Sequence, residues 1–205
     1  MKITGIRAII GTLCALAVSS EISQANVIFN LGNQPQPNEE NVLFSGGTSG
    51  TTVVGNGNQS GIGVAFSSLT DTLTVPSSGQ ARIASTDGLL NSITVNVPGG
   101  FFGDLIVNPF KGSGVGILTV VDTDLSTFTF SYGLGTGNNF VTITTSGGES
   151  IYSVRIDSAS GFDSLVQPRI SDVRLASSVP DAGSCLTLLA ASMFGLGWVR
   201  RLTSR

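Results

Sequence analysis

Apolar and polar residues alternate with a period of two along much of the middle of this chain. In the run TFTFSY, the side chains of Phe128, Phe130 and Tyr132 fall on one side and hydroxyl groups fall on the other. Val141 and Ile143 alternate with threonines in the same way. Successive side chains of a β-strand point to opposite faces of its sheet. These segments therefore predict strands with one buried face and one solvated face.

Similar short runs, rich in β-branched and aromatic residues, occur throughout the central region. The predicted strands cover residues 26–31, 42–44, 51–54, 62–66, 72–75, 81–84, 92–97, 105–107, 116–121, 127–132, 140–145, 151–156 and 170–175. Over residues 151–157 the alternation predicts that odd-numbered side chains face solvent and even-numbered side chains face the core. Gly, Pro, Asn and Asp separate the runs about every eight to twelve residues, which is typical of a β-sandwich. Because one-sided burial favours antiparallel sheets, we predict an all-β, jelly-roll-like antiparallel β-sandwich over residues 26–176.

The N-terminal segment has a different pattern. Basic residues precede an apolar run over residues 8–18, and the small residues Ser23 and Ala25 stand where a signal peptidase reads the chain. Residues 1–25 are therefore predicted to be a secretory signal peptide, cleaved after Ala25. The alternative is an uncleaved membrane anchor.

The C-terminal segment, residues 177–205, combines a short polar motif, an apolar run and a basic end. The motif consists of Val179, Pro180, Asp181, Ala182, Gly183 and Ser184. As a helix, the apolar run over residues 186–199 would reach about 21 Å, against about 30 Å for the hydrocarbon core of a bilayer. This length predicts a single membrane-associated helix suited to transient retention, although an ordinary amphipathic or core helix is the alternative. Arg200 and Arg201 follow the run directly, and such residues stay cytoplasmic, so the preceding chain is expected to face outward.

This C-terminal order resembles the VPDSG variant of the PEP-CTERM sorting tail, which bacterial exosortases process. The sequence departs from that pattern at Ala182, where the family usually has Ser, and at Cys185, where Thr is common. The resemblance implies export through the inner membrane, association with the membrane before processing, and cleavage near the motif by an exosortase-like membrane protease. It also implies a location in the cell envelope, at the cell surface or in the extracellular matrix of a bacterium. The chain is thus expected to be a substrate of an enzyme and not an enzyme itself.

Charge and cysteine content narrow the expected partners. Residues 26–178 carry five basic and eleven acidic side chains, a net charge of −6. Without a basic stripe, a nucleic-acid partner is not expected, because phosphate neutralisation supplies most of such binding. The only two cysteines, Cys14 and Cys185, lie in the two end segments, so the central domain must be stable without disulfides.

The chain has no histidine, which removes the commonest general base and the usual zinc ligand. We therefore predict no catalytic residues and no cofactor. The one candidate metal site is Asp122-Thr123-Asp124, whose carboxylates could supply oxygen ligands to Ca²⁺. The alternative is that these carboxylates bond backbone amides in a turn.

Three functions are compatible with this pattern. The first is a structural or adhesive protein of the cell surface or extracellular matrix, and the second is a carbohydrate-binding module that recognises surface polysaccharide through loops. The third is a hydrolase that uses two carboxylates, although the sequence does not indicate which acidic residues would pair. Phe101 and Phe102 could form an exposed loop tip for sugar binding, but Leu105 nearby favours a corner that closes the core.

Overall fold

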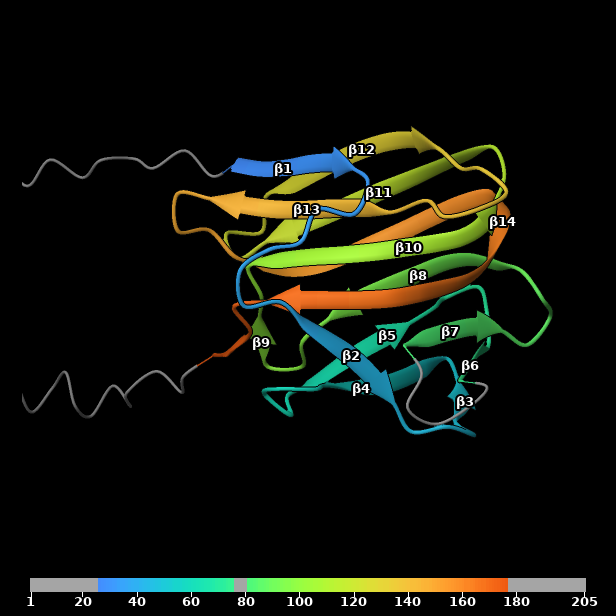
Figure 1. Cartoon of the computed structure of the whole chain (residues 1–205), viewed down its shortest axis with the longest axis horizontal. Coiled ribbons are helices and arrows are strands. Elements are labelled where there is room, and N and C mark those ends of the chain that lie inside the picture. The colour runs from blue at the N-terminus through green and yellow to red at the C-terminus, as the bar shows by residue number, and fades with distance from the viewer. Residues whose placement is uncertain (1–25, 76–80, 177–205) are drawn as a thin grey trace, which may run out of the picture.

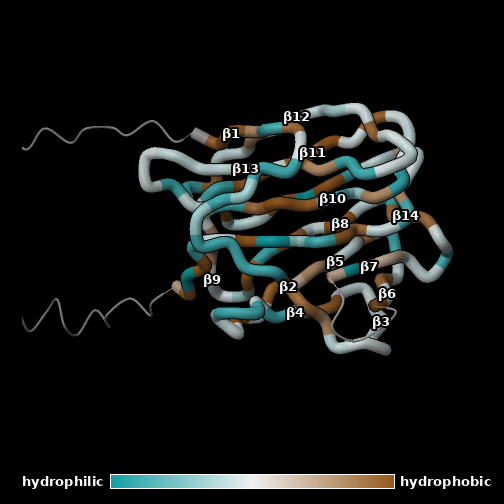
Figure 2. Tube along the Cα trace, viewed as in Figure 1, coloured by the Kyte–Doolittle hydropathy of each residue, from teal (hydrophilic) through white to brown (hydrophobic). Residues whose placement is uncertain are grey.

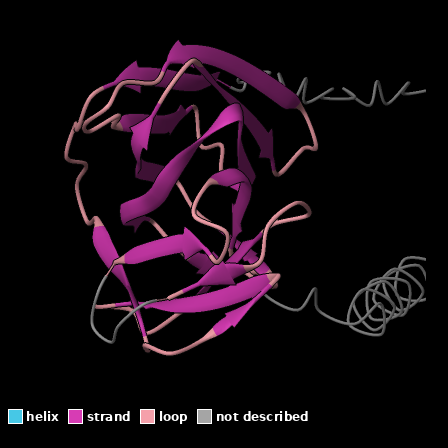
Figure 3. Ribbon diagram, turned by 90° about the vertical axis from the view of Figure 1, so that its right-hand side faces the viewer, coloured by secondary structure: helices cyan, strands magenta, loops and turns pink. Residues whose placement is uncertain are grey.

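The computed structural model describes residues 26–75 and 81–176. The predicted signal peptide with Ser23 and Ala25, and the predicted sorting tail with Arg200 and Arg201, lie outside the described residues. Within the described residues every regular element is a β-strand (Figure 3). All pairings between these strands are antiparallel. The predicted all-β, antiparallel class is confirmed.

Each of the predicted runs overlaps an observed strand. The strands are β1 (Asn26–Leu31), β2 (Glu40–Phe44), β3 (Ser49–Gly50), β4 (Thr52–Gly57), β5 (Gly63–Ser67), β6 (Leu73–Thr74), β7 (Arg82–Ser85), β8 (Leu90–Asn96), β9 (Gly100–Phe101), β10 (Asp104–Gly112), β11 (Val115–Asp122), β12 (Thr127–Gly133), β13 (Val141–Ser146), β14 (Ile151–Ser171) and β15 (Arg174–Leu175). The main disagreement concerns β14, a single strand of 21 residues where the sequence predicts two short strands.

Strand β14 is the central strand of the fold. It pairs with other strands along both of its edges and in both of its halves. Its first half lies between β11 and β8. Its second half pairs with β10 on one edge and with β7 and β2 on the other. The two halves meet at Gly161, whose φ of +71° lies in the left-handed region that favours glycine. The pairing with β8 also shifts its register between Asp157 and Phe162, so the strand can bend without ending.

The strands on the two sides of the molecule are joined in different ways (Figure 1). We call the side formed by β2, β4, β5 and β8 the closed side, and the side formed by β1, β11, β12 and β13 the open side. On one side, hydrogen-bonded neighbours run from β14 through β2, β4, β5 and β8 and return to β14, which closes this part of the sheet on itself. On the other side, among the described strands, β1 pairs only with β13 and β12 pairs only with β11. There Phe29 of β1 and Phe130 of β12 stack with ring centroids 5.1 Å apart. Side chains, rather than backbone hydrogen bonds, join these two strands.

Hydrophobic and hydrophilic positions succeed one another along the strands (Figure 2), as one-sided burial requires. The core is made of inward-facing aliphatic side chains from most strands together with Phe66, Phe102 and Phe162, all fully buried. Burial of Phe102 confirms the expectation of a corner that closes the core, whereas its neighbour Phe101 is half-buried. Tyr132 is buried, but Phe128 and Phe130 are only partly buried and pack against the margin of the core.

The predicted alternation fails at the start of β14. Ile151, predicted to face solvent, is fully buried, and Tyr152, predicted to face the core, is 52% exposed. The cause is a β-bulge: Val121 of β11 pairs with Ser153, while Asp122 pairs with Ile151, so Tyr152 is an extra residue. A bulge shifts the alternation by one position.

Candidate functional site

The strongest candidate site lies on the solvent side of β12, β11, the first half of β14 and β8, which we call the outer face. Hydroxyl groups dominate it. One row of side chains crosses the outer face and continues onto β5, because these residues lie directly opposite one another: Thr129, Thr119, Arg155, Thr94 and Ser67. Opposite residues on neighbouring strands have Cβ atoms about 5 Å apart. These five side chains therefore form a regular polar row on the surface of the sheet.

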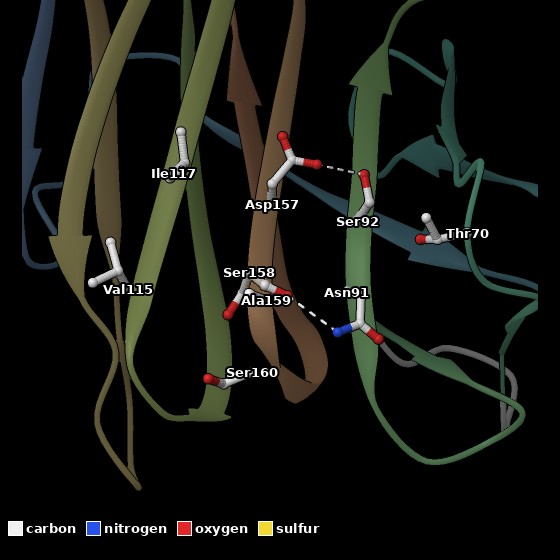
Figure 4. Close-up of a pocket in the computed structure, with 9 residues that line it drawn as sticks. All are labelled: Thr70, Asn91, Ser92, Val115, Ile117, Asp157, Ser158, Ala159 and Ser160. Carbon is white, nitrogen blue, oxygen red and sulfur yellow. Dashed lines mark hydrogen bonds between the residues drawn. The ribbon is translucent and has the colours of Figure 1, made fainter.

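Asp157 is the centre of the polar contacts on this face (Figure 4). Its Oδ1 accepts a hydrogen bond from the Ser92 hydroxyl at 2.7 Å, and its Oδ2 accepts one from Arg155 Nε at 2.7 Å. Asn91 Nδ2 donates to the Ser158 carbonyl oxygen at 3.1 Å, which ties β8 to β14. Because Arg155 is half-exposed, the ion pair orients the two side chains more than it stabilises the fold.

An open groove of about 590 Å³ lies beside Asp157. Val115 and Ile117 form its apolar side and are 56% and 40% exposed, respectively. Its lining is completed by Thr70, Asn91, Ser92, Asp157, Ser158, Ala159 and Ser160. The groove thus combines an apolar surface with hydroxyl, amide and carboxylate groups at its edge.

A second, smaller groove of about 250 Å³ lies on the same face, lined by Thr94, Thr119, Val121, Thr127, Ser153 and Arg155. Both grooves border the first half of β14, between Ser153 and Ser160. At about 3.3 Å per residue this stretch measures about 23 Å. The exposed Tyr152, the extra residue of the bulge, directly precedes Ser153 in β14. Together the two grooves form an elongated surface.

The buried carboxylate of Asp71 positions one wall of the larger groove. Its Oδ2 accepts hydrogen bonds from the backbone N–H groups of Asn91 and Ser92, both at 3.1 Å, and from the Thr70 hydroxyl at 2.6 Å. Burial alone would raise the pKa of Asp71, but the hydrogen bonds from Thr70, Ser92, Asn91 and Ser68 outweigh it and lower the pKa. The ionised carboxylate therefore fixes Thr70 against β8.

The candidate metal ligands Asp122 and Asp124 differ in their burial. Asp122 is fully buried, and its Oδ1 accepts a hydrogen bond from the Ser126 backbone N–H at 2.8 Å. Its carbonyl oxygen accepts one from Leu125, which has φ +64°. Asp124 is exposed. The turn role is thus confirmed for Asp122, and among the described residues no group of three or more acidic side chains is placed to hold a metal ion.

Acidic side chains gather at one other place. A polar pocket of about 270 Å³ brings together Asp104, Glu149, Asp172 and Arg174. Asp104 is already engaged, because its Oδ2 accepts a hydrogen bond from the Ser171 hydroxyl at 2.6 Å. On the outer face, Asp157 is the one carboxylate that lines either groove.

Sequence reasoning did not find the outer face as a site. The hydroxyl pattern of each strand is visible in the sequence, but the partners of Asp157 are not, because Ser92 lies 65 residues away. The exposed Tyr152 depends on the bulge, which has no local sequence signal.

Comparison with protein-family models, curated proteins and solved structures finds no match for this chain. No helix long and apolar enough to cross a membrane occurs in residues 26–75 or 81–176.

Proposed function

We propose that this chain is an exported protein of the cell surface or extracellular matrix with a structural or adhesive role. The observation that carries the proposal is the C-terminal order of the VPDAGS motif, the apolar run and the pair Arg200-Arg201. An exosortase-like membrane protease would process the tail after residues 1–25 have directed export. The arrangement of the domain supports this role, because the start of β1 and strand β9, which pairs with β15, lie on the same side of it (Figure 1).

We also propose that the architecture is a jelly-roll-like sandwich whose two layers share β14. The stacked pair Phe29 and Phe130 supports this arrangement, because it joins β1 and β12 without hydrogen bonds between them. Such a domain keeps a large sheet surface available to other components of the cell surface.

Intact mass of the protein from its native host tests the sorting proposal. The expected mature chain begins at Asn26 and ends between Val179 and Ser184. Replacing Pro180 and Asp181 by alanine should block C-terminal processing and leave thermal unfolding unchanged, because the motif lies beyond β15. The matched control Ser177→Ala should be processed normally. A chain that ends at Arg205 in the wild type, or normal processing of the double variant, would contradict the proposal.

A carbohydrate-binding role is the second candidate, and the outer face favours it. Sugar rings present apolar C–H faces and hydroxyl edges, and the two grooves offer apolar side chains and hydroxyl groups along about 23 Å of β14. The exposed Tyr152 directly precedes this stretch in the same strand. The sequence pattern suggested binding through loops, whereas we propose that the polysaccharide binds on the outer face of the sheet. The net charge of −6 over residues 26–178 favours neutral over anionic polysaccharides.

Retention during affinity electrophoresis in gels that contain neutral or anionic polysaccharides tests this second role. We expect saturable retention on a neutral polymer, weakened at least about fivefold by Tyr152→Ala, since one stacked ring contributes on the order of 1 kcal/mol. Leu125→Ala, at an exposed residue in the turn between β11 and β12, is the matched control. A wild-type chain that no neutral polymer retains would contradict this role, and equal retention of Tyr152→Ala and wild type would exclude the Tyr152 ring as a contact.

A further inference from the structure

The outer edge of β12 carries backbone groups without a strand partner. In the described part of the chain β12 pairs with β11 alone, over seven consecutive residue pairs without a register shift. In Figure 1, β12 and β1 form the upper margin of the molecule. An edge strand of this length offers a row of N–H and C=O groups to another strand.

Charged residues, proline and a bulge, three usual protections of an edge strand, are absent from β12. Its sequence, TFTFSYG, contains no charged residue and no proline, and its pairing has no bulge. Exposed edges in soluble proteins are normally very short, charged, interrupted by proline or bulged. The small strand β3, which has two residues, follows that rule. The second edge of β12 can therefore pair with a further strand.

The sequence of β12 is complementary to itself in the antiparallel direction. A pairing centred on Thr129 sets Thr127 opposite Ser131 and Phe128 opposite Phe130. Hydroxyl groups then face hydroxyl groups on the outer face, and aromatic rings face aromatic rings on the inner face, and both kinds of cross-strand pair are stabilising. No like charges meet in this pairing.

The inner side chains are already held in place for such a contact. Phe130 stacks on Phe29 at 5.1 Å and on Tyr132 at 6.2 Å between ring centroids. Phe128 and Phe130 are only partly buried within one molecule, so each has apolar surface left to bury. Little side-chain entropy is lost when rings that are already ordered meet a partner.

We propose that β12 pairs with β12 of a second copy of this chain, antiparallel and centred on Thr129, to form a two-fold symmetric dimer. The same strand edge serves both copies, as a two-fold interface requires. The pairing joins two outer faces into one continuous sheet surface that carries both sets of grooves. This inference goes beyond the proposed function and does not depend on the tail.

Disulfide trapping tests the register directly. The protein is the full chain in detergent with Cys14→Ser and Cys185→Ser, to which Thr129→Cys is added. Opposite residues of an antiparallel pair have Cα atoms about 4.5–5.5 Å apart, within the range of a disulfide. Mild oxidation should give a covalent dimer. Thr119→Cys is the matched control: it lies on the same face one strand inward, where two copies would be about 14 Å apart, and should stay monomeric.

Sedimentation of the full chain without cysteine substitutions tests the association itself. Thr129→Lys places two like charges directly opposite each other and should raise the dissociation constant at least about tenfold. Thr119→Lys should leave it unchanged, and thermal unfolding checks that both variants fold. A wild-type chain that stays monomeric overturns the proposal. So does a disulfide between Thr129→Cys and Ile28→Cys chains in place of the Thr129 homodimer, because the partner would then be β1.

Discussion

The closed side and the open side of the molecule use the same side-chain device but differ in their backbone. On the closed side Phe44 of β2 lies across Gly55 of β4, and on the open side Tyr132 of β12 lies across Gly116 of β11. A Cβ atom at Gly55 would lie 2.8 Å from the Phe44 ring, and one at Gly116 would lie 2.9 Å from the Tyr132 ring. Each ring covers a glycine that has no side chain of its own to pack. Only the closed side has an unbroken circuit of hydrogen-bonded strands. On the open side, β1 and β12 are joined to each other by aromatic contacts instead.

Two loops, one on each side, are held by polar contacts that differ in charge. On the closed side the buried Glu40 carboxylate accepts hydrogen bonds from the backbone N–H groups of Gln59 and Ser60, at 2.9 Å and 2.8 Å, and from the Ser60 hydroxyl. At the end of β12 the following loop is held by neutral amides: Asn139 Nδ2 donates to the carbonyl oxygen of Pro109 at 2.8 Å, and Asn108 accepts from the Asn139 backbone N–H. The loop held by Glu40 should therefore respond to acid, whereas the amide contacts of the loop after β12 should not.

The largest effect is expected from Phe66→Ala on the closed side. Phe66 is fully buried and meets Phe44 edge to face, with ring centroids 5.2 Å apart. Removing a buried phenylalanine ring costs about 3–5 kcal/mol through lost apolar burial and the cavity left behind. Urea denaturation followed by fluorescence or circular dichroism measures this loss. A loss below about 1 kcal/mol would show that the closed side can collapse around the cavity.

Phe130→Ala tests the open side and should cost less, about 2 kcal/mol, because the ring is only partly buried. The loss should still exceed that of Thr129→Ala, its outward-facing neighbour, which should stay within about 0.5 kcal/mol. The same urea denaturation compares the two variants. If Phe130→Ala destabilised the domain as much as Phe66→Ala, the two sides would be equally dependent on their aromatic rings and the contrast would fail.

The aromatic positions also show how far the sequence predicts the fold. The period of two in β12 correctly separates Phe128, Phe130 and Tyr132 from the hydroxyl groups, since alternation is a local property of a strand. It does not predict that Phe128 and Phe130 lie at the margin, because the depth of a strand in the core depends on which strands cover it. The open side, which decides their exposure, is a property of the whole topology.

Strand β14 shows what local patterns miss. Gly161 and Pro168 are normally signals of a break, so the sequence predicts two short strands. In the structure Gly161 adopts a left-handed conformation at which β14 bends without ending. Pairing with neighbouring strands along both edges keeps the strand continuous. The bulge at Tyr152 is set by the partner strand β11. The grooves and the contacts of Asp157 depend on these nonlocal pairings, so the sequence could predict a wet face but not a site.

Glu40→Gln probes the charged contact of the closed side's loop and should cost about 1–2 kcal/mol at neutral pH. Burial opposes ionisation of Glu40, but hydrogen bonds from Ser60 and Gln59 outweigh it and lower the pKa below the ordinary value of 4.5. A lowered carboxyl pKa adds stability that is fully present above the unfolded pKa and is lost as the pH falls through the folded pKa. The stability difference between wild type and variant should therefore shrink below about pH 4.5.

Denaturation midpoints measured from pH 7 down to pH 3 test this dependence. Asp124→Asn, a change at an exposed carboxylate, is the matched control and should leave the acid limb unchanged. A variant difference that stays constant down to pH 3 would mean that the hydrogen bonds of Glu40 do not depend on its charge.

The smallest effect is expected from Tyr132→Phe on the open side, and its sign is informative. The Tyr132 hydroxyl is buried without a hydrogen-bond partner among the described residues, and burial raises its pKa, so it stays protonated. Removing a buried, unpaired hydroxyl relieves its desolvation cost while the ring still covers Gly116. Urea denaturation should show stability unchanged or raised by up to about 1 kcal/mol, with the exposed Tyr152→Phe as a neutral control. A loss above about 1 kcal/mol would instead indicate a bound water that bridges Tyr132 to Ser158. The buried Ser158 hydroxyl also lacks a partner among the described residues. Ser158 and Tyr132 lie directly opposite Gly116 on its two neighbouring strands. In that case the open side would be held by a polar contact as well as by its rings.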